Sequence, residues 1–231
     1  MMNHRKILSS GSLCRFFCFA ILGLLCACGS RDEGSGDASS PAPQLHTFAY
    51  DCDDGSYIVT HMGPEDDAIT IFLPGETIRL PHIQSGSGAK YSDGKITFWT
   101  KGKEALLEIE GADPLKCLEN RRRSWIEDAK LRGNDYWAAG NEPGWTLEIG
   151  PEQTVLKTNY GQDRYEFKTP EPAVDGEARH TTYRAYVDGM AIVIEISGVP
   201  CQDSMSGEAF ETSVSVQLGG QELLGCGQAL H

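Results

Sequence analysis

The chain has 231 residues, with 20 Lys and Arg against 33 Asp and Glu, and its formal net charge is −13. This balance argues against a nucleic-acid partner and against adhesion to an anionic lipid surface, because both need clustered cations. It favours a basic partner instead. Hydrophobic residues make up 40% of the sequence, too many for a disordered chain, so we expect at least one packed core.

Residues 1–27 have the pattern of a secretory signal peptide. Arg5, Lys6 and Arg15 come before an apolar run, Phe16–Leu25, of about ten residues, which is too short to span a bilayer. The segment then closes with the letters LCAC at residues 25–28, which resemble the bacterial lipobox, whose cysteine is lipidated. The resemblance implies cleavage before Cys28 and acylation of Cys28, with palmitate as an expected acyl group. An ordinary cleavage site that leaves Cys28 free is the alternative.

Residues 28–45 are predicted to be the lipidated cysteine and a flexible tether, because they are rich in Gly, Ser, Asp, Ala and Pro. Gly29 is not the Asp that usually marks retention in the inner membrane. The lipobox resemblance therefore implies a lipid anchor in the outer membrane, with the protein facing the periplasm. Without the leader the balance is 17 cations against 33 anions, or −16.

Four cysteines remain beyond the anchor: Cys52, Cys117, Cys201 and Cys226. An even number in an exported chain indicates disulfides. Three pairings are possible, and sequence proximity favours Cys52–Cys117 and Cys201–Cys226. Zinc is the competing interpretation, but the sequence has no C-x2-C spacing and no His near any of these cysteines. We expect no metal and no cofactor.

Short strand-like runs separated by turn residues predict an all-β chain with two small antiparallel domains, each barrel-like or sandwich-like. The first domain is expected at residues 46–120 and the second at 138–231, with a connector helix within 121–137. The predicted strands are His46–Cys52, Tyr57–His61, Ala68–Leu73, Thr77–Leu80, Lys95–Thr100, Ala105–Glu110, Trp145–Ile149, Thr154–Thr158, Arg164–Phe167, Thr181–Val187, Met190–Ile196 and Ser213–Leu218.

One segment, residues 118–132, has a helical pattern, with Trp125, Ile126 and Ala129 forming a partial apolar stripe. The run Arg121–Arg123 within it is a candidate anion site. A solvated helix face is the more economical interpretation in an acidic chain.

Two loops of the first domain carry unusual residues. Gln84–Tyr91 alternates Ser and Gly, which cannot serve as core and whose small side chains suit entry into a narrow cleft. Trp99–Ala105 places Lys101 in a tight turn at a strand end. The two loops flank a short hairpin around Asp93 and Gly94, so we expect them at the same end of the sheet.

The motifs SGSGAKY (Ser85–Tyr91) and FWTKGKEA (Phe98–Ala105) resemble those of the membrane-bound inhibitors of c-type lysozyme. The resemblance covers residues 48–118 and includes the sequence around Cys52 and Cys117. It implies an eight-stranded antiparallel barrel-like fold, no catalytic activity, c-type lysozyme as the partner, and a Ser-Gly loop that enters the active-site cleft. Carried over to this chain, the key groups are Ser87 and Lys101. The expected lysozyme-binding set is Ser85, Ser87, Gly88, Tyr91 and Lys101.

The second domain contains the motifs GNEPGW (140–145), CQDSMSGE (201–208) and LGCGQAL (224–230). They resemble an uncharacterised exported domain of bacterial lipoproteins, which brings no mechanism. Ser206 is not in a Gly-x-Ser-x-Gly elbow, so we predict no catalytic residues. The Asp203–Glu208 segment is expected to form a loop held by the Cys201–Cys226 bridge. A ligand or cell-wall pocket made by Glu142, Trp145 and Asp203 is the alternative.

These patterns favour a lipid-anchored inhibitor of c-type lysozyme, not an enzyme, that protects peptidoglycan and serves the evasion of host defence at the cell envelope. The alternative is an envelope structural or cell-wall-binding lipoprotein without inhibitory activity. An exported hydrolase working through the second domain is the least supported hypothesis. The sequence carries no indication of the oligomeric state.

Overall fold

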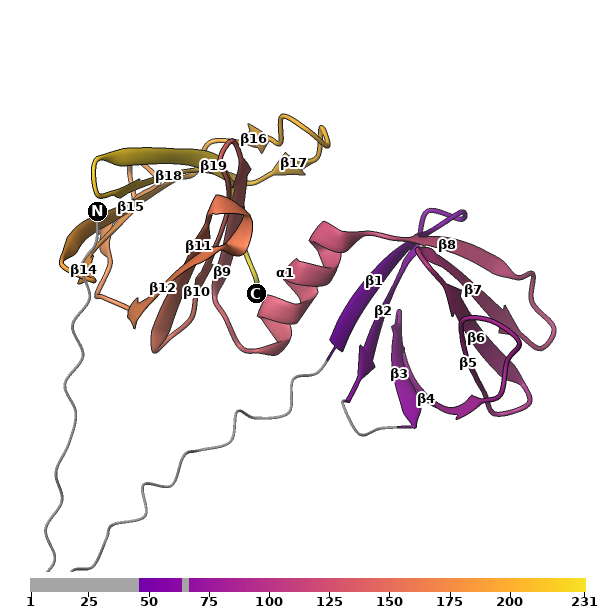
Figure 1. The fold of residues 1–231 in the computed structure, drawn as a ribbon. Helices are drawn as coiled ribbons and strands as arrows, with labels where there is room; N and C mark the ends of the chain where they lie inside the picture. Colours follow the sequence, from indigo (N-terminus) through magenta and orange to yellow (C-terminus); the bar gives the residue numbers. More distant parts are fainter. Residues whose placement is uncertain (1–45, 64–66) are drawn as a thin grey trace, which may run out of the picture. The chain divides into compact units, whose positions relative to one another are not determined.

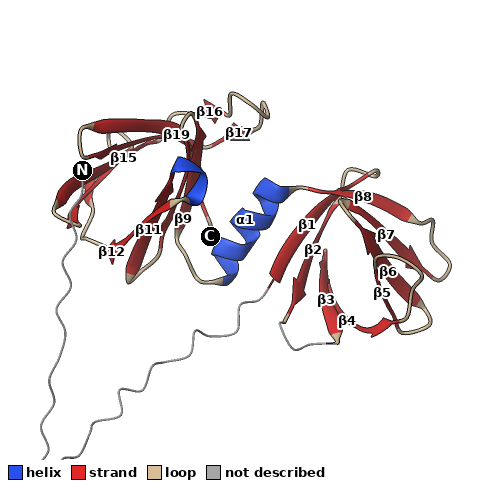
Figure 2. Cartoon of the chain, in the orientation of Figure 1, coloured by secondary structure: helices blue, strands red, loops and turns tan. Residues whose placement is uncertain are grey.

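The computed structural model describes residues 46–63 and 67–231. The predicted signal peptide, Cys28 and the tether lie outside these residues. Strands dominate the described chain, and one α-helix and one 3-10 turn accompany them, as Figures 1 and 2 show. The all-β prediction is confirmed. Within the described residues, no helix is long and apolar enough to cross a membrane.

The first domain is a closed barrel in which each strand pairs with its neighbour in sequence and β1 pairs with β8. All these pairings are antiparallel. The strands are β1 His46–Cys52, β2 Tyr57–Met62, β3 Ala68–Leu73, β4 Glu76–Ile83, β5 Ala89–Ser92, β6 Ile96–Lys101, β7 Glu104–Ile109 and β8 Leu115–Glu119. The sequence patterns did not predict β5 and β8 as strands. Both strands are short and are stabilised by their neighbours. β5 pairs with β6, and β8 pairs with β1 and β7.

Alternate residues of the barrel strands fill its interior, and Ile71, Leu80 and Phe98 have no exposed surface. Strand β3 is fully buried only on the face that points into the barrel. Ile69 and Ile71 point into the core, whereas Thr70 between them and Phe72 after them are half-buried on the outside. The outer face of the strand is thus partly covered and not enclosed.

The seam of the barrel is closed by a disulfide as well as by backbone pairing. Cys52 on β1 is directly opposite Cys117 on β8, with a Cα–Cα distance of 4.0 Å, and the two are bonded. A cross-link over a loop of this length stabilises the folded state by about 4 kcal/mol in the chain-entropy account. The predicted pairing is confirmed, as is Cys201–Cys226 in the second domain.

Helix α1 spans Arg121–Leu131, which is shorter than the predicted 118–132. It begins where the Asn120 side chain accepts a hydrogen bond from the Arg123 backbone N–H at 3.0 Å, an N-cap that the prediction missed. Its buried residues are Ser124, Ile126 and Ala129, whereas Trp125 is 42% exposed. The predicted apolar stripe was therefore wrong at Trp125.

The second domain is a single nine-stranded antiparallel sheet with the order β12-β11-β10-β9-β19-β18-β15-β14-β13. β9 begins at Tyr136, two residues before the predicted domain start. The elements are β9 Tyr136–Asn141, β10 Gly144–Ile149, β11 Gln153–Thr158, the 3-10 turn η1 Asn159–Gly161, β12 Asp163–Lys168, β13 Ala173–Asp175, β14 His180–Val187, β15 Met190–Ser197, β18 Thr212–Leu218 and β19 Gln221–Ala229, with β16 Cys201–Gln202 and β17 Ala209–Phe210 forming a separate two-stranded ribbon.

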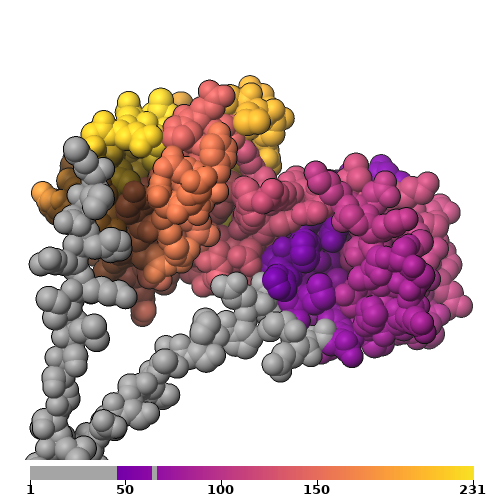
Figure 3. Space-filling model, in the orientation of Figure 1, coloured from indigo at the N-terminus to yellow at the C-terminus, as the bar shows by residue number. Residues whose placement is uncertain are grey.

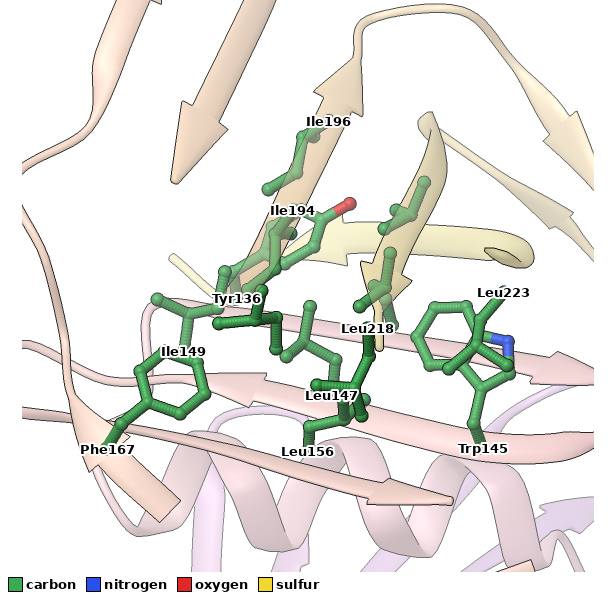
Figure 4. Close-up of a cluster of buried hydrophobic side chains, with 14 of the residues drawn as sticks. Tyr136, Trp145, Leu147, Ile149, Leu156, Phe167, Ile194, Ile196, Leu218 and Leu223 are labelled. Carbon is green, nitrogen blue, oxygen red and sulfur yellow. The ribbon is translucent and has the colours of Figure 1, made fainter. Parts of the chain in front are cut away.

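The sheet curls so that β12 and β14 approach each other and enclose a hydrophobic core. Figure 4 shows Leu147 and Leu156 from one part of the sheet facing Ile194 and Leu218 from another. The opposite face of β9 is buried too, because Trp137 and Ala139 pack in a second cluster that includes residues of α1. β9 is therefore covered on both faces.

Two of the three arginines at the start of α1, Arg122 and Arg123, are not part of a solvated face, which corrects that prediction for them. Arg122 Nη1 lies 2.7 Å from the Asp203 carboxylate, and the Arg122 side chain is only 18% exposed. Arg123 Nε lies 3.0 Å from the Asp51 carboxylate on β1. The Ser124 hydroxyl accepts a hydrogen bond from the Ala49 backbone N–H, so the helix is joined to β1 at several points. In the space-filling view of Figure 3 the indigo atoms of β1 lie against the pink atoms of the helix.

Candidate functional site

The Ser-Gly loop and Lys101 lie side by side at one end of the barrel, as expected from the sequence. The loop connects β4 to β5 (Figure 1), and β5 begins at Ala89, which pairs with Thr100 on β6. Lys101 is the next residue of β6 and begins the turn to β7. Strand pairing therefore brings two segments that are separate in the sequence to the same edge.

The loop is held by hydrogen bonds from two side chains to its own carbonyls. The Ser85 hydroxyl lies 2.8 Å from the Gly88 carbonyl oxygen and 3.2 Å from that of Ser87. The indole N–H of Trp99 donates to the Ser87 carbonyl at 2.8 Å. The loop thus has a defined shape although its surface is exposed.

Gly88 is required by the close approach of the loop to β6. Its φ is +68°, in the left-handed region, and a Cβ built there would lie 2.1 Å from the Thr100 carbonyl oxygen. Gly86, two residues earlier, has nothing within 4 Å of the corresponding position. Of these two loop glycines, only Gly88 is fixed by its surroundings.

The two groups singled out by the motif resemblance are free to bind a partner. The Ser87 side chain is exposed, and among the described residues its hydroxyl makes no hydrogen bond, since only its carbonyl is engaged. The Lys101 side chain is also exposed and forms no ion pair within the described part of the chain. A neutral donor and a cation are thus presented together.

Tyr91 differs from the other four predicted binding residues. It lies on β5 with 4% of its surface exposed, and its ring belongs to the barrel core. Its hydroxyl lies 3.1 Å from the Met62 sulfur, and burial, with a smaller effect of Asp67, raises its pKa. Tyr91 therefore supports β5, which starts directly after the Ser-Gly loop.

A surface hollow of about 620 Å³ adjoins Lys101 on the outside of the barrel. Trp99 and Leu106 contribute to its wall, as does Leu118, which is 61% exposed. Trp99 thus contacts the Ser-Gly loop and lines this hollow together with Lys101.

The alternative for the second domain, a pocket made by Glu142, Trp145 and Asp203 together, does not form. Trp145 is 3% exposed in the core, where its indole N–H donates to the Leu224 carbonyl at 3.2 Å. Glu142 is exposed in the turn between β9 and β10. A hollow of about 340 Å³ does border Asp203, together with Asn141 and Ser204, but neither Glu142 nor Trp145 lines it.

Asp203 is saturated by contacts within the protein. Its carboxylate accepts hydrogen bonds from the Ser206 backbone N–H at 2.7 Å and from the Asn141 amide at 2.8 Å, besides its pair with Arg122. Burial alone raises the pKa of Asp203, but these hydrogen bonds outweigh it and hold the pKa well below its ordinary value. The expected loop beside the Cys201–Cys226 bridge is confirmed, and Asp203 is its structural centre.

Nothing in the sequence indicates that Arg122 and Asn141 meet Asp203, because the three residues are far apart along the chain. The motif glycines around them also have a packing role. A Cβ at Gly140 would lie 2.2 Å from the Trp145 indole nitrogen, and one at Gly225 would lie 2.1 Å from the Ala139 carbonyl oxygen. These motif residues maintain close contacts within the sheet.

Comparison with known proteins identifies the barrel. Residues 50–116 match a family described as membrane-bound lysozyme-inhibitor of c-type lysozyme. A relative from Yersinia enterocolitica (serotype O:8 / biotype 1B), named membrane-bound lysozyme inhibitor of C-type lysozyme, is 36% identical over 93 residues, which cover 40% of this chain and 77% of the relative. The chain belongs to this family.

Two further members of the inhibitor family carry the same name. The protein from Cupriavidus necator is 29% identical over 119 residues, covering 49% of this chain and 93% of the relative. The protein from Pseudomonas aeruginosa is 28% identical over 117 residues, covering 45% of this chain and 92% of the relative. No solved structure matches the chain. The family match lies within the barrel, and residues 138–231 lie outside it.

Proposed function

We propose that the protein is a lipid-anchored inhibitor of c-type lysozyme, which places its Ser-Gly loop and Lys101 in the active-site cleft of the enzyme. It acts by occluding the cleft and catalyses no reaction. The observation that carries this proposal is the juxtaposition of the Ser87 hydroxyl and the Lys101 ammonium, neither with a partner among the described residues, at one end of a family barrel.

The chemistry of the target suits these two groups. A retaining glycosidase such as c-type lysozyme uses two carboxyl groups in its cleft, one protonated and one ionised. The Ser87 hydroxyl can hydrogen-bond to one of them, and the Lys101 ammonium can form an ion pair with the other. Hydrogen bonds that involve a charged group contribute about 1.5–3 kcal/mol each when they are shielded from water.

The charge of the rest of the chain supports the same partner. The family's target is a basic protein, and the chain without its leader carries −16. Opposite net charges accelerate the encounter of two proteins. Lys101 is therefore a local cation on a surface whose overall field attracts a cationic enzyme.

The proposed location is the outer membrane, with acylated Cys28 as the anchor and residues 29–45 as the tether, facing the periplasm. Two or more acyl chains on one cysteine give stable membrane attachment, whereas a single chain does not. An inhibitor held there would meet lysozyme close to the peptidoglycan that it protects.

The test is a lysis assay with a soluble form, residues 29–231, which keeps every described residue. We expect this protein to slow the clearing of a suspension of bacterial cell walls by hen-type lysozyme. The double variant Ser87→Ala/Lys101→Ala should inhibit more than tenfold less well. Lys95→Ala, at the opposite end of β6, is the matched control and should inhibit normally. Full inhibition by a folded double variant would refute the proposal.

A further inference from the structure

The Ser-Gly loop depends on one aromatic side chain outside the loop. Trp99 follows the buried Phe98 on β6, and its own side chain points outward from the barrel. Its indole N–H donates to the carbonyl oxygen of Ser87, the residue whose hydroxyl is presented to the partner. Trp99 thus connects the strand that carries Lys101 to the loop that carries Ser87.

Three features fix this connection geometrically. The Ser85 hydroxyl donates to the carbonyls of Ser87 and Gly88, so a second side chain also holds the loop. A Cβ at Gly88 would lie 3.2 Å from the Trp99 indole nitrogen, which shows how closely the loop lies on the ring. The Lys90 ammonium stands 5.8 Å from the centre of the same ring and adds a cation–π contact.

A loop of Ser and Gly is otherwise poorly suited to rigid recognition. Glycine loses more backbone freedom on ordering than any other residue. A flexible loop would lose this freedom at the moment of binding and weaken the complex, whereas a loop already held in shape does not. The cost of ordering the loop has therefore been met in folding the free protein.

We propose that Trp99 is a positioning residue for lysozyme binding: its indole N–H, together with the Ser85 hydroxyl, holds the Ser-Gly loop in the shape that presents the Ser87 hydroxyl beside Lys101. This inference rests on the proposed function. It also revises the expected role of Ser85, which acts through the loop carbonyls and not by contact with the enzyme.

The decisive variant is Trp99→Phe, which removes the N–H and keeps an aromatic ring. Loss of one neutral hydrogen bond should weaken lysozyme binding about three- to tenfold, measured as the dissociation constant for residues 29–231. Trp125→Phe is the matched control, because Trp125 is an exposed tryptophan on α1. It should bind like the unchanged protein.

A double-mutant cycle separates positioning from direct contact. If Trp99 acts by positioning Ser87, then Trp99→Phe should change the dissociation constant for lysozyme only slightly in a protein that already carries Ser87→Ala. If the fold-losses in affinity of the two single variants instead multiply in the double variant, Trp99 contacts lysozyme independently of Ser87. This outcome would overturn the inference. Ser85→Ala should behave as Trp99→Phe does, again losing its effect in the Ser87→Ala background.

Backbone relaxation measured by NMR on the free protein gives a readout that needs no lysozyme. Trp99→Phe should increase the mobility of the amides of residues 86–88 and leave those of the Asp93–Gly94 turn unchanged. Unchanged loop mobility would overturn the inference whether or not the protein binds lysozyme. If the unchanged protein fails to bind while the loop still loosens in Trp99→Phe, the proposed function fails and the positioning of the loop stands.

Discussion

At the scale of single residues, the end of the barrel proposed to bind lysozyme combines free and engaged groups. The Ser87 hydroxyl and the Lys101 ammonium have no partner among the described residues, whereas the Ser85 hydroxyl is occupied by loop carbonyls. Motif resemblance alone predicts all of them as equal contacts. Hydrogen-bond partners and burial, which depend on the folded loop, separate the groups that are left free from those that hold the loop.

Gly88→Ala should destabilise the protein by about 1–3 kcal/mol. The substitution puts a Cβ against the Thr100 carbonyl and forces a non-glycine residue into the left-handed region. Chemical denaturation measures the change. Gly86→Ala is the control within the same loop, because the added methyl meets nothing there. Equal stability of the two variants would contradict the close approach of the loop to β6.

At the scale of elements, the sequence predicted strands well where an alternating pattern was local. The predicted bounds of β1 and β3 match the observed ones. β19 was missed because its glycines look like breakers. A Cβ at Gly227 would lie 2.3 Å from the Tyr136 hydroxyl, so glycine is present there because the neighbouring strand leaves no room. That reason appears only when β9 and β19 are paired.

The contact between α1 and the loop that contains Asp203 could not be predicted from the sequence either. Three adjacent arginines indicate a solvated face when the acids that they meet are far away in the chain. In the fold, Arg122 reaches the buried carboxylate of Asp203 and Arg123 reaches Asp51 on β1. Asn120 caps the helix start that positions both side chains. The run is therefore a structural element that pairs with two separate acids.

Asp203→Asn should destabilise the protein at neutral pH by about 3 kcal/mol, because it leaves Arg122 beside a group without charge. The variant should also be less sensitive to acid. The pKa of Asp203 is lowered in the folded state, so its contribution is fully present above the unfolded pKa of about 3.9 and is lost as the pH falls below that value.

Melting temperatures between pH 7 and pH 2 test this expectation. The difference in melting temperature between the unchanged protein and Asp203→Asn should become smaller below about pH 4. Glu177→Gln, an exposed carboxyl in the same domain, removes the same charge and should follow the unchanged protein throughout. A constant difference at every pH would mean that the charge of Asp203 does not stabilise the fold.

At the scale of the whole molecule, net charge and the local cation have separate effects on binding. Residues 46–120 carry 6 Lys and Arg against 13 Asp and Glu, or −7, and residues 138–231 carry 5 against 14, or −9. Both domains therefore contribute to the field that would attract the proposed basic partner at long range. The positive charge of Lys101 weakens that field at a distance. In the proposed complex, Lys101 stabilises binding only on contact, through its ion pair with a carboxyl group of the enzyme.

Lys101→Met should therefore act on dissociation and not on association. The rate of association with lysozyme should stay the same or rise slightly, because removing one cation makes the chain more acidic, while dissociation should become about tenfold faster as the ion pair is lost. Surface plasmon resonance at several salt concentrations measures both rates. Raising the salt from about 0.05 M to about 0.3 M should slow association of both proteins equally, since screening acts on the whole field. If Lys101→Met instead slows association at low salt, Lys101 guides the encounter, and the acidic surface is not what draws the enzyme in.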